Sequence, residues 1–371
     1  MSGILKAPGA TGSSQATGPE TGYSSRNPPM TPAAPVARDP SAVAAEAEMV
    51  ADAHRRMTRA LGSVIVGQEQ VLDLLLTALF CKGHCILEGV PGLAKTLMIS
   101  SLSKLLSMSF NRIQFTPDLM PSDITGTEIL QENKSSGQRE LRFVQGPVFA
   151  NLVLADEINR TPPKTQSALL QAMQEHHVTV SGKSFALPNP FFVLGTQNPI
   201  ESEGTYPLPE AQLDRFMFKI SVDYPTLADE IRIATSTTSR QSVTLEPVMT
   251  EADILRIQDV VRDVLVADPV ASYAVRLARA TRPTDASSSA EIRRWLSWGA
   301  GPRAVQYLIL GAKSRAALTG GYMVRLEDIA AVAAPVLTHR VLTTFAAQAE
   351  GIDAKKIVER LVAEALAEQN G

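Results

Sequence analysis

The chain has 371 residues, 44% of them hydrophobic and 20% charged, and its 35 basic and 38 acidic side chains leave a formal net charge of −3. The length suits two domains plus a tail, and the near balance of charge excludes a general electrostatic attraction to nucleic acid. No apolar stretch is long enough to span a bilayer, and the N-terminal residues lack the charged-then-apolar order of a secretory signal. Because two cysteines are too few for a disulfide framework, we expect a cytoplasmic protein.

The first 42 residues differ in composition from the rest of the chain. Of the first 40 residues, 27 are Gly, Pro, Ser, Thr or Ala, and Tyr23 is their one aromatic residue. Such a segment buries too little apolar surface to offset the entropy lost on ordering, so a disordered tail is predicted over residues 1–42. Helical patterns follow at residues 43–61 and in a stretch that ends at Leu79.

Residues 43–225 have the pattern of an α/β domain. Between His84 and Val222, short apolar runs bounded by turn residues alternate with helical patterns, which is typical of buried parallel strands flanked by helices. The expected strands cover residues 84–90, 108–115, 151–157, 191–197 and 218–223. Two inserted hairpins are expected, at residues 127–144 and 177–187.

Residues 226–371 have helical patterns, and an all-α domain is predicted there. The expected helices cover residues 251–282, 302–318, 327–343 and 353–367. Arg276, Arg279 and Arg282 recur every three residues, and they form either a solvated basic face or a subunit interface. Trp295 and Trp298 are interpreted as core or interface residues rather than a ligand platform.

The most informative motif is GVPGLAKT, which lies between an expected strand and an expected helix. It comprises Gly89, Val90, Pro91, Gly92, Leu93, Ala94, Lys95 and Thr96. In this order, backbone N–H groups and the helix N-terminus favour phosphate, Lys95 would reach the β- and γ-phosphates of ATP, and the Thr96 hydroxyl would bind Mg²⁺. Ala94 replaces the second glycine of the usual pattern, which is tolerable if its φ is negative. The alternative is a Gly-Pro turn that only begins a helix.

Two further expected strands end in polar residues. Asp156 and Glu157 follow the run NLVLA, where Asp156 would hold Mg²⁺ and Glu157 would polarise the attacking water. Asn198 follows the run FFVLGTQ and would lie near the γ-phosphate, although Asn-Pro turns are common. Arg160 and Lys164 follow the acidic pair closely, and they form either contacts to a neighbouring subunit or local ion pairs.

These motifs, with LPEAQLDRF at residues 208–216 and GPRA at residues 301–304, resemble the MoxR family of AAA+ ATPases. The resemblance extends from Val43 to the C-terminal end, and Ala94 is ordinary in that family. It implies an α/β fold, an AAA+ P-loop NTPase core with a parallel sheet, flanking helices and hairpin inserts, plus an α-helical lid domain. It also implies assembly as a homo-oligomeric ring, usually a hexamer.

The resemblance assigns roles to single residues as well. It implies that Asn198 is sensor 1, that Arg303 is sensor 2 carried by the lid, and that Arg215 is an arginine finger acting on ATP held by the neighbouring subunit. Val66 and Gly67 would belong to the loop that packs on the adenine. The two hairpins would be the helix-2 insert and the pre-sensor-1 insert of the family.

The function implied is that of an ATP- and Mg²⁺-dependent ring ATPase that remodels, activates or matures a client protein or complex. Members of the family commonly act with a partner that bears a von Willebrand factor A domain. Two alternatives are a helicase-like nucleic-acid motor, against which the acidic net charge argues, and a nucleotide switch with negligible turnover.

Cys81, His84 and Cys85 lie close together in the sequence, and three such residues would suit a metal ion. The sequence has no second Cys/His group that would complete a tetrahedral site, so we interpret the cysteines as buried, inert thiols. His176 and His177 are expected at the surface, where the second hairpin begins.

Overall fold

The computed structural model describes residues 40–132, 139–199, 204–237 and 244–370. Most of the predicted tail, residues 1–39, and the predicted turn of the first hairpin, residues 133–138, lie outside these ranges. The fold described below belongs to the unit Asp39–Gly371.

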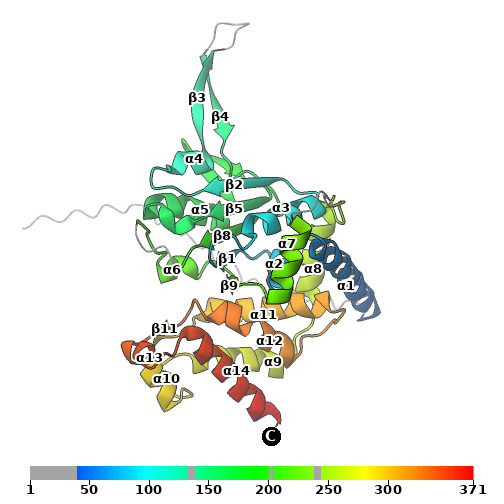
Figure 1. Ribbon diagram of the computed structural model, residues 1–371, viewed down its shortest axis with the longest axis vertical. Helices are drawn as coiled ribbons and strands as arrows, with labels where there is room; N and C mark the ends of the chain where they lie inside the picture. Colours follow the sequence, from blue (N-terminus) through cyan, green and yellow to red (C-terminus); the bar gives the residue numbers. More distant parts are fainter. Residues whose placement is uncertain (1–39, 133–138, 200–203, 238–243, 371) are drawn as a thin grey trace, which may run out of the picture. The chain divides into compact units, whose positions relative to one another are not determined.

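A five-stranded parallel sheet is the centre of the α/β part (Figure 1). Its strand order is β2–β5–β8–β1–β9, and all neighbouring strands are parallel. The strands are β1 (Cys85–Glu88), β2 (Phe110–Gln114), β5 (Leu152–Asp156), β8 (Phe192–Gln197) and β9 (Phe218–Ser221). Each lies within a run predicted from the sequence, so the predicted parallel α/β fold is confirmed.

Alternate side chains of the strands face two separate hydrophobic cores. In β5, Leu152 and Leu154 belong to the first core, whereas Val153 and Ala155 belong to the second, as the two-residue repeat of a strand requires. Residues of α5 (Pro163–Glu175) enter the second core. The first core receives residues of α1 (Pro40–Gly62), α2 (Glu69–Phe80), α3 (Lys95–Leu105) and α8 (Glu251–Asp263).

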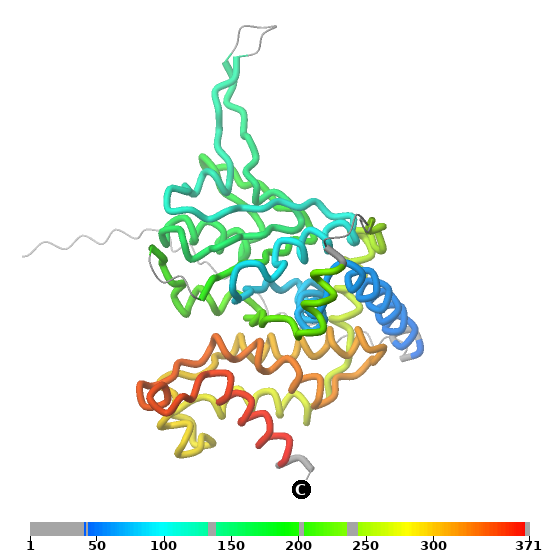
Figure 2. The backbone as a smooth tube through the Cα atoms, in the orientation of Figure 1, coloured from blue at the N-terminus to red at the C-terminus, as the bar shows by residue number. Residues whose placement is uncertain are grey.

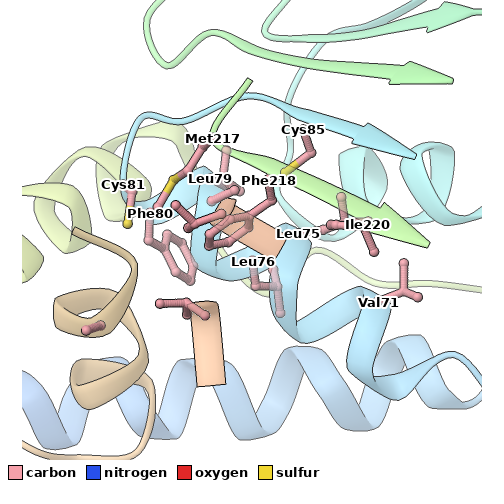
Figure 3. Packing of buried hydrophobic residues seen from close by; sticks show 14 of the residues in the cluster. Val71, Leu75, Leu76, Leu79, Phe80, Cys81, Cys85, Met217, Phe218 and Ile220 are labelled. Atoms are coloured by element: carbon pink, nitrogen blue, oxygen red, sulfur yellow. The ribbon is translucent and has the colours of Figure 1, made fainter. Parts of the chain in front are cut away.

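Helix α2 packs directly on the sheet. Its apolar face, which includes Leu75 and Leu79, lies against Phe218 and Ile220 of β9 (Figure 3). All four side chains are almost fully buried. Because burial of a Leu, Ile or Phe side chain contributes about 1.5–3 kcal/mol, this contact fixes the end of α2 and the following turn at Lys82 against the sheet.

Both predicted hairpins are present in the structure. The first pairs β3 (Gly126–Glu132) with β4 (Arg139–Gln145) and extends away from the sheet (Figures 1 and 2). The second pairs β6 (His177–Val180) with β7 (Lys183–Ala186). The hairpins contact each other: the Phe143 and Phe185 rings stack with centroids 4.0 Å apart, and Lys183 Nζ lies 3.0 Å from Glu128 Oε1.

The C-terminal part is helical, but it also contains a small β element. Its helices after α8 are α9 (Asp268–Ala280), α10 (Ala290–Trp295), α11 (Pro302–Leu318), α12 (Leu326–Leu337), α13 (Phe345–Ala349) and α14 (Ala354–Asn370). An antiparallel pair joins β10 (Leu296–Trp298) to β11 (Leu342–Thr343), so the all-α prediction is wrong at this point. Strands of two and three residues are too short to show a two-residue repeat.

The single helix predicted over residues 251–282 is also wrong, because α8 and α9 are separate helices. Residues 264–267 interrupt them, and Leu265 forms a β-bridge with Met323. Pro269 occupies the first turn of α9, a position that proline favours because its missing N–H needs no partner there. The remaining short helices are α4 (Pro121–Thr125), α6 (Glu210–Leu213), α7 (Leu227–Thr237) and the 3₁₀ turn Ile158–Arg160. Within the described ranges, no helix has both the length and the hydropathy needed to cross a bilayer.

Candidate functional site

A polar cavity of about 390 Å³ lies at the carboxyl-terminal edge of the parallel sheet. It is lined by Pro91, Gly92, Ala94, Lys95, Thr96, Arg112, Asp156, Glu157, Thr196 and Asn198. The loop after β1, the acidic pair at the end of β5 and Asn198 after β8 thus converge, because the carboxyl ends of parallel strands share one edge. This is the edge at which ligands bind in open α/β sheets.

The loop after β1 requires special backbone conformations. Gly92 has φ of 88°, and a Cβ on Gly89 would lie 2.8 Å from the Val222 carbonyl oxygen, so neither position suits a larger residue. Ala94 has φ of 55° and ψ of 21°, so the requirement for a negative φ stated from the sequence is wrong. A left-handed non-glycine residue costs about 1–2 kcal/mol. The surrounding structure therefore holds the loop in a strained form next to the cavity.

Lys95 begins α3 and folds back over the loop. Its Nζ donates hydrogen bonds to the carbonyl oxygens of Gly89, at 2.6 Å, and Val90, at 3.3 Å. Burial lowers the pKa of Lys95, and the nearby Asp156 and Glu157 carboxylates partly offset this effect. The ammonium group is therefore held at the cavity wall among carbonyl and carboxylate oxygens.

The acidic pair is held by residues that the sequence interpretation missed. Asp156 Oδ2 accepts hydrogen bonds from Arg112 Nη2, at 2.6 Å, and Nε, at 3.1 Å, while its Oδ1 accepts one from Thr196 Oγ1 at 2.6 Å. Glu157 Oε2 accepts hydrogen bonds from Gln114 Nε2, at 2.8 Å, and from Arg160 Nη1, at 3.0 Å. Arg160 therefore makes one of the local ion pairs considered from the sequence.

Arg112 and Gln114 had a usable signal in the sequence. They lie two residues apart near the carboxyl end of an expected strand, so their side chains share one face. In the structure β2 is the edge strand beside β5, and Gln114 is the register partner of Asp156. A search for polar pairs at strand ends would have found them, but their neighbour in the sheet could not be read from the sequence.

The predicted adenine loop lies beside the P-loop segment rather than in the cavity wall. Gly67 has φ of 74°, and a Cβ there would lie 2.9 Å from Asp229 Oδ2 at the start of α7. Gln68 Nε2 donates a hydrogen bond to the Asp223 carbonyl oxygen, which ties this loop to the segment after β9. The cavity wall therefore does not include Val66 and Gly67 of the predicted adenine loop, nor Gly89, Val90 and Leu93 of the P-loop segment.

Arg215 and Arg303 lie at the opposite edge of the sheet. Phe218, three residues after Arg215, is the register partner of Cys85, the first residue of β1. Because β1 has four residues and a strand rises about 3.3 Å per residue, about 13 Å of sheet separates this edge from the loop that follows β1. Arg215 and Arg303 line a second cavity, of about 200 Å³, at the amino-terminal edge.

Family models match two segments of this chain. The model "ATPase family associated with various cellular activities (AAA)" matches residues 84–218, and the model "AAA lid domain" matches residues 289–361. The chain is 43% identical to Chaperone MoxR1 of Mycobacterium tuberculosis over 302 residues, which cover 81% of this chain and 78% of the relative. It is 31% identical to Protein MoxR of Methylorubrum extorquens, with 78% and 88% covered.

The chain belongs to the MoxR family of AAA+ ATPases. A crystal structure from Cytophaga hutchinsonii, of a protein assigned as an ATPase, has a TM-score of 0.80 and 38% identity to it. That likeness covers 87% of this chain and 97% of the other. The family resemblance found in the sequence and the predicted AAA+ fold with a helical lid are both confirmed.

In this MoxR-family chain, the segment that carries Arg215 is tied to the helical lid by a buried arginine. Arg340 Nε donates to Asp214 Oδ1 at 2.8 Å, and Arg340 Nη2 donates to the carbonyl oxygens of Asp214 and Phe216 at 2.8 and 2.7 Å. The Arg340 side chain is only 2% exposed. Arg303 Nη1 donates to the other carboxylate oxygen, Asp214 Oδ2, at 2.8 Å. Asp214 thus forms ion pairs with two guanidinium groups.

The cysteines and their neighbouring histidine are buried in the MoxR-family fold. Burial raises the pKa of the Cys81 thiol to about 12 and that of Cys85 well above its usual value, so both thiols are protonated at neutral pH. His84 accepts a hydrogen bond at Nδ1 from the Val193 N–H, at 3.1 Å, and its Nε2 lies 3.2 Å from the Met173 carbonyl oxygen. Burial lowers the pKa of His84 to about 4, so it is a neutral structural residue.

The remaining aromatic and basic residues divide between core and surface. Trp295 is buried, and its Nε1 donates to Glu350 Oε2 at 3.0 Å, whereas Trp298 is 68% exposed. In the arginine stripe of α9, Arg279 pairs with Asp285, and Arg282 Nε donates to the Ala300 carbonyl oxygen at 2.9 Å. Two of the three arginines therefore make contacts within the chain.

Proposed function

We propose that this chain hydrolyses ATP with Mg²⁺, and that it does so as a head-to-tail ring of identical subunits, six in number. The proposal rests on one observation. The P-loop and the acidic pair lie at the carboxyl-terminal edge of the sheet, whereas Arg215 and Arg303 lie at the amino-terminal edge. The two groups of residues meet only when one subunit places its amino-terminal edge against the carboxyl-terminal edge of the next.

The residues at the carboxyl-terminal edge suit a Mg²⁺–nucleotide complex. Gly92 has open space where a Cβ would be, so its backbone is accessible to a phosphate. The Thr96 hydroxyl and the Asp156 carboxylate supply the oxygen ligands that Mg²⁺ prefers, and Lys95 supplies a positive charge. When bound, Mg²⁺ would neutralise charge that develops on the phosphate oxygens during phosphoryl transfer.

The other residues of this edge would orient the attacking water and bind the adenine. Glu157 would orient and polarise the attacking water, and Asn198 would donate a hydrogen bond beside it. Val66 and Gly67 would hold the adenine through the loop that packs against α7. In this proposal Gln114 and Arg160 set the position of the Glu157 carboxylate, which is why both contact the same oxygen.

The cations at the amino-terminal edge would act on the neighbouring subunit's ATP. Arg215 and Arg303 share one small cavity, so a phosphate that reaches one also approaches the other. A head-to-tail interface is heterologous, and such an interface forms a closed ring when its rotation closes. Hydrolysis would therefore depend on assembly, because each chain holds its own nucleotide but lacks the cations that complete the site.

The cellular role proposed is chaperone-like, in which ATP turnover remodels, activates or matures a client protein or complex in the cytoplasm. The 43% identical relative is a chaperone, which supports this role and does not favour the nucleic-acid motor. We further propose a partner with a von Willebrand factor A domain, on the family resemblance alone. A pull-down with Glu157→Gln and ATP should recover such a partner; recovery of nucleic acid alone would contradict the proposal.

Complementation between inactive variants tests the head-to-tail site. Lys95→Ala removes the P-loop ammonium and Arg215→Ala removes the proposed arginine finger, so each variant alone should hydrolyse ATP slowly. For Arg215→Ala the rate of hydrolysis should fall by a factor of about 10³–10⁵. Equal mixing leaves about a quarter of the interfaces intact, so phosphate release should return toward a quarter of the wild-type rate. Lys95→Ala mixed with Glu157→Gln is the matched control, because both changes lie at one edge and leave no complete site. No rescue in the first mixture would contradict action in trans.

A further inference from the structure

The cavity at the amino-terminal edge contains more positive charge than the two arginines supply. Lys82 and His176 line it together with Arg215 and Arg303, and none of the described residues that line it is an aspartate or glutamate. Asp214 lies beside it, but this carboxylate is already shared by Arg303 and Arg340. Among the described residues, neither the Lys82 ammonium nor the Arg215 guanidinium has a carboxylate partner within ion-pair distance.

Lys82 is held in place by the turn that follows α2. Its N–H donates to the Leu79 carbonyl oxygen at 3.2 Å, and the Gly83 N–H donates to the Ala78 carbonyl oxygen at 2.8 Å. A Cβ on Gly83 would lie 2.4 Å from Met217 Sδ, so this turn is pressed against the residue two positions after Arg215. The sheet therefore fixes Lys82 and Arg215 relative to each other.

His176 closes the other side of the cavity. It ends α5 in a left-handed conformation with φ of 54°, and its carbonyl oxygen accepts a hydrogen bond from the Leu187 N–H at 3.0 Å, which closes the second hairpin. Burial, and to a smaller extent the positive charge of Lys82, lower the pKa of His176. At neutral pH its ring is therefore a neutral hydrogen-bond donor beside three permanent cations.

Such a site fits a terminal phosphate. Guanidinium groups match the geometry of phosphate oxygens, and an ammonium adds a point charge. Because no carboxylate lines the cavity in the part of the chain that the structure describes, this charge is available to a ligand. A free phosphate would meet the same chemistry, but the cavity lies at the edge that the proposed ring turns toward a neighbouring P-loop. The occupant with the matching position is the γ-phosphate of ATP bound to that neighbour.

We infer that Lys82 and His176 complete, with Arg215 and Arg303, a four-residue site for the γ-phosphate of ATP bound by the adjacent subunit. This inference rests on the proposed head-to-tail assembly and extends it. Lys82 contributes a charge-assisted hydrogen bond that ADP cannot form. The site would therefore make assembly depend on which nucleotide the neighbour holds.

The experiment measures assembly rather than turnover. In the Glu157→Gln background, sedimentation velocity gives the subunit concentration at half-assembly with Mg²⁺ and either ATP or ADP. Lys82→Asn removes the charge and tolerates the left-handed backbone at φ of 57°. It should raise the half-assembly concentration in ATP about tenfold or more, the equivalent of one charge-assisted hydrogen bond, and leave the ADP value unchanged. His176→Asn should act in the same direction, and Lys82→Arg should restore assembly.

Three comparisons make the result decisive. Lys355→Asn changes an exposed lysine of α14 and should match the parent protein. If Arg215→Ala impairs ATP-dependent assembly but Lys82→Asn equals Lys355→Asn, the four-residue site is wrong and the ring proposal stands. If Arg215→Ala has no effect either, the head-to-tail proposal itself fails. Lys82→Gly, which also suits a positive φ, replaces Lys82→Asn if thermal unfolding shows that the asparagine variant is not folded.

Discussion

The two edges of the central sheet differ in how their charges are compensated. At the carboxyl-terminal edge, Asp156 forms an ion pair with Arg112, and Glu157 forms one with Arg160. At the amino-terminal edge, the described lining of the cavity contains three permanent cations and no carboxylate. The first edge is thus nearly balanced within one chain, whereas the second has positive charge that its own cavity does not neutralise.

This difference indicates which edge needs a partner. A cavity with balanced charges keeps its side chains in position without a ligand, so it can bind nucleotide in a single subunit. Unpaired cations instead raise the free energy of the isolated chain until an anion approaches. In the proposed ring, the ATP held at one edge supplies that anion to the other, and assembly then stabilises both.

Of the substitutions that compare the two edges below, Glu157→Gln at the carboxyl-terminal edge is expected to have the largest effect. Glu157→Gln removes the carboxylate that is proposed to polarise the water, but it keeps its size and a hydrogen-bond acceptor for Gln114. ATP should therefore still bind, while phosphate release falls about 10²–10⁴-fold. Binding is measured by isothermal titration and turnover by phosphate release. The matched control is Glu359→Gln on the exposed side of α14, which should leave both values unchanged. Turnover within threefold of wild type in Glu157→Gln would assign the general base elsewhere.

At the amino-terminal edge, a further effect is expected on stability. Asp214→Ala leaves the buried Arg340 guanidinium without its carboxylate, and loss of one partner of a buried pair costs about 3–5 kcal/mol. Asp214 is about one-third exposed, so the lower end of this range is expected in the urea unfolding midpoint. Asp52→Ala in α1 is the control, because Asp52 and its partner Arg56 are both more than half exposed, and the pair should contribute less than about 1 kcal/mol. Equal losses of stability in both variants would contradict the view that the Arg340–Asp214 pair holds this edge to the lid.

The two edges also differ in how far the sequence could predict them. The P-loop, Asp156 and Glu157 could be predicted because each lies at or directly after the end of a strand in a short, continuous motif. Gln114 had a signal as a polar residue at a strand end, but its contact with Glu157 and the role of Lys82 could not be predicted, because both depend on which strands are neighbours in the sheet. Gln114 reaches Glu157 only because β2 pairs with β5, and Lys82 lies near Arg215 only because β1 pairs with β9.

The predicted lid shows the same limit. Its long helices were predicted from apolar periodicity, and α11 has the predicted bounds. The β10–β11 pair joins segments more than 40 residues apart, and its strands are too short to have a pattern. The end of α12 was also placed too late, because the apolar pattern continues past Leu337 into the segment that contains the buried Arg340. Long-range pairing, rather than local preference, decides both features.

His84 provides a test of the buried layer beneath the amino-terminal edge. Its pKa is lowered from about 6.5 in an unfolded chain to about 4 in the fold, so the unfolded state binds more protons between these values and stability falls as pH decreases. Integration over this window gives a loss of about 2 kcal/mol between pH 7 and pH 5. Urea unfolding of wild type and His84→Gln at both pH values measures it, and the variant should show a smaller pH dependence. An unchanged dependence would mean that other groups, such as the buried His339, carry it.

The smallest effect is expected at Ala94, on the opposite edge. Ala94→Gly relieves a left-handed alanine, worth about 1–2 kcal/mol, but increases the entropy of the unfolded chain, so a net stabilisation of up to about 1 kcal/mol is expected. Ala363→Gly, at an exposed position inside α14, should instead destabilise the protein by about 1 kcal/mol, because no strain is relieved there. Opposite signs in the two unfolding midpoints would establish that the P-loop stores strain. Equal destabilisation would show that Ala94 is unstrained. Alanine in place of the usual glycine would then not reduce the stability of the protein.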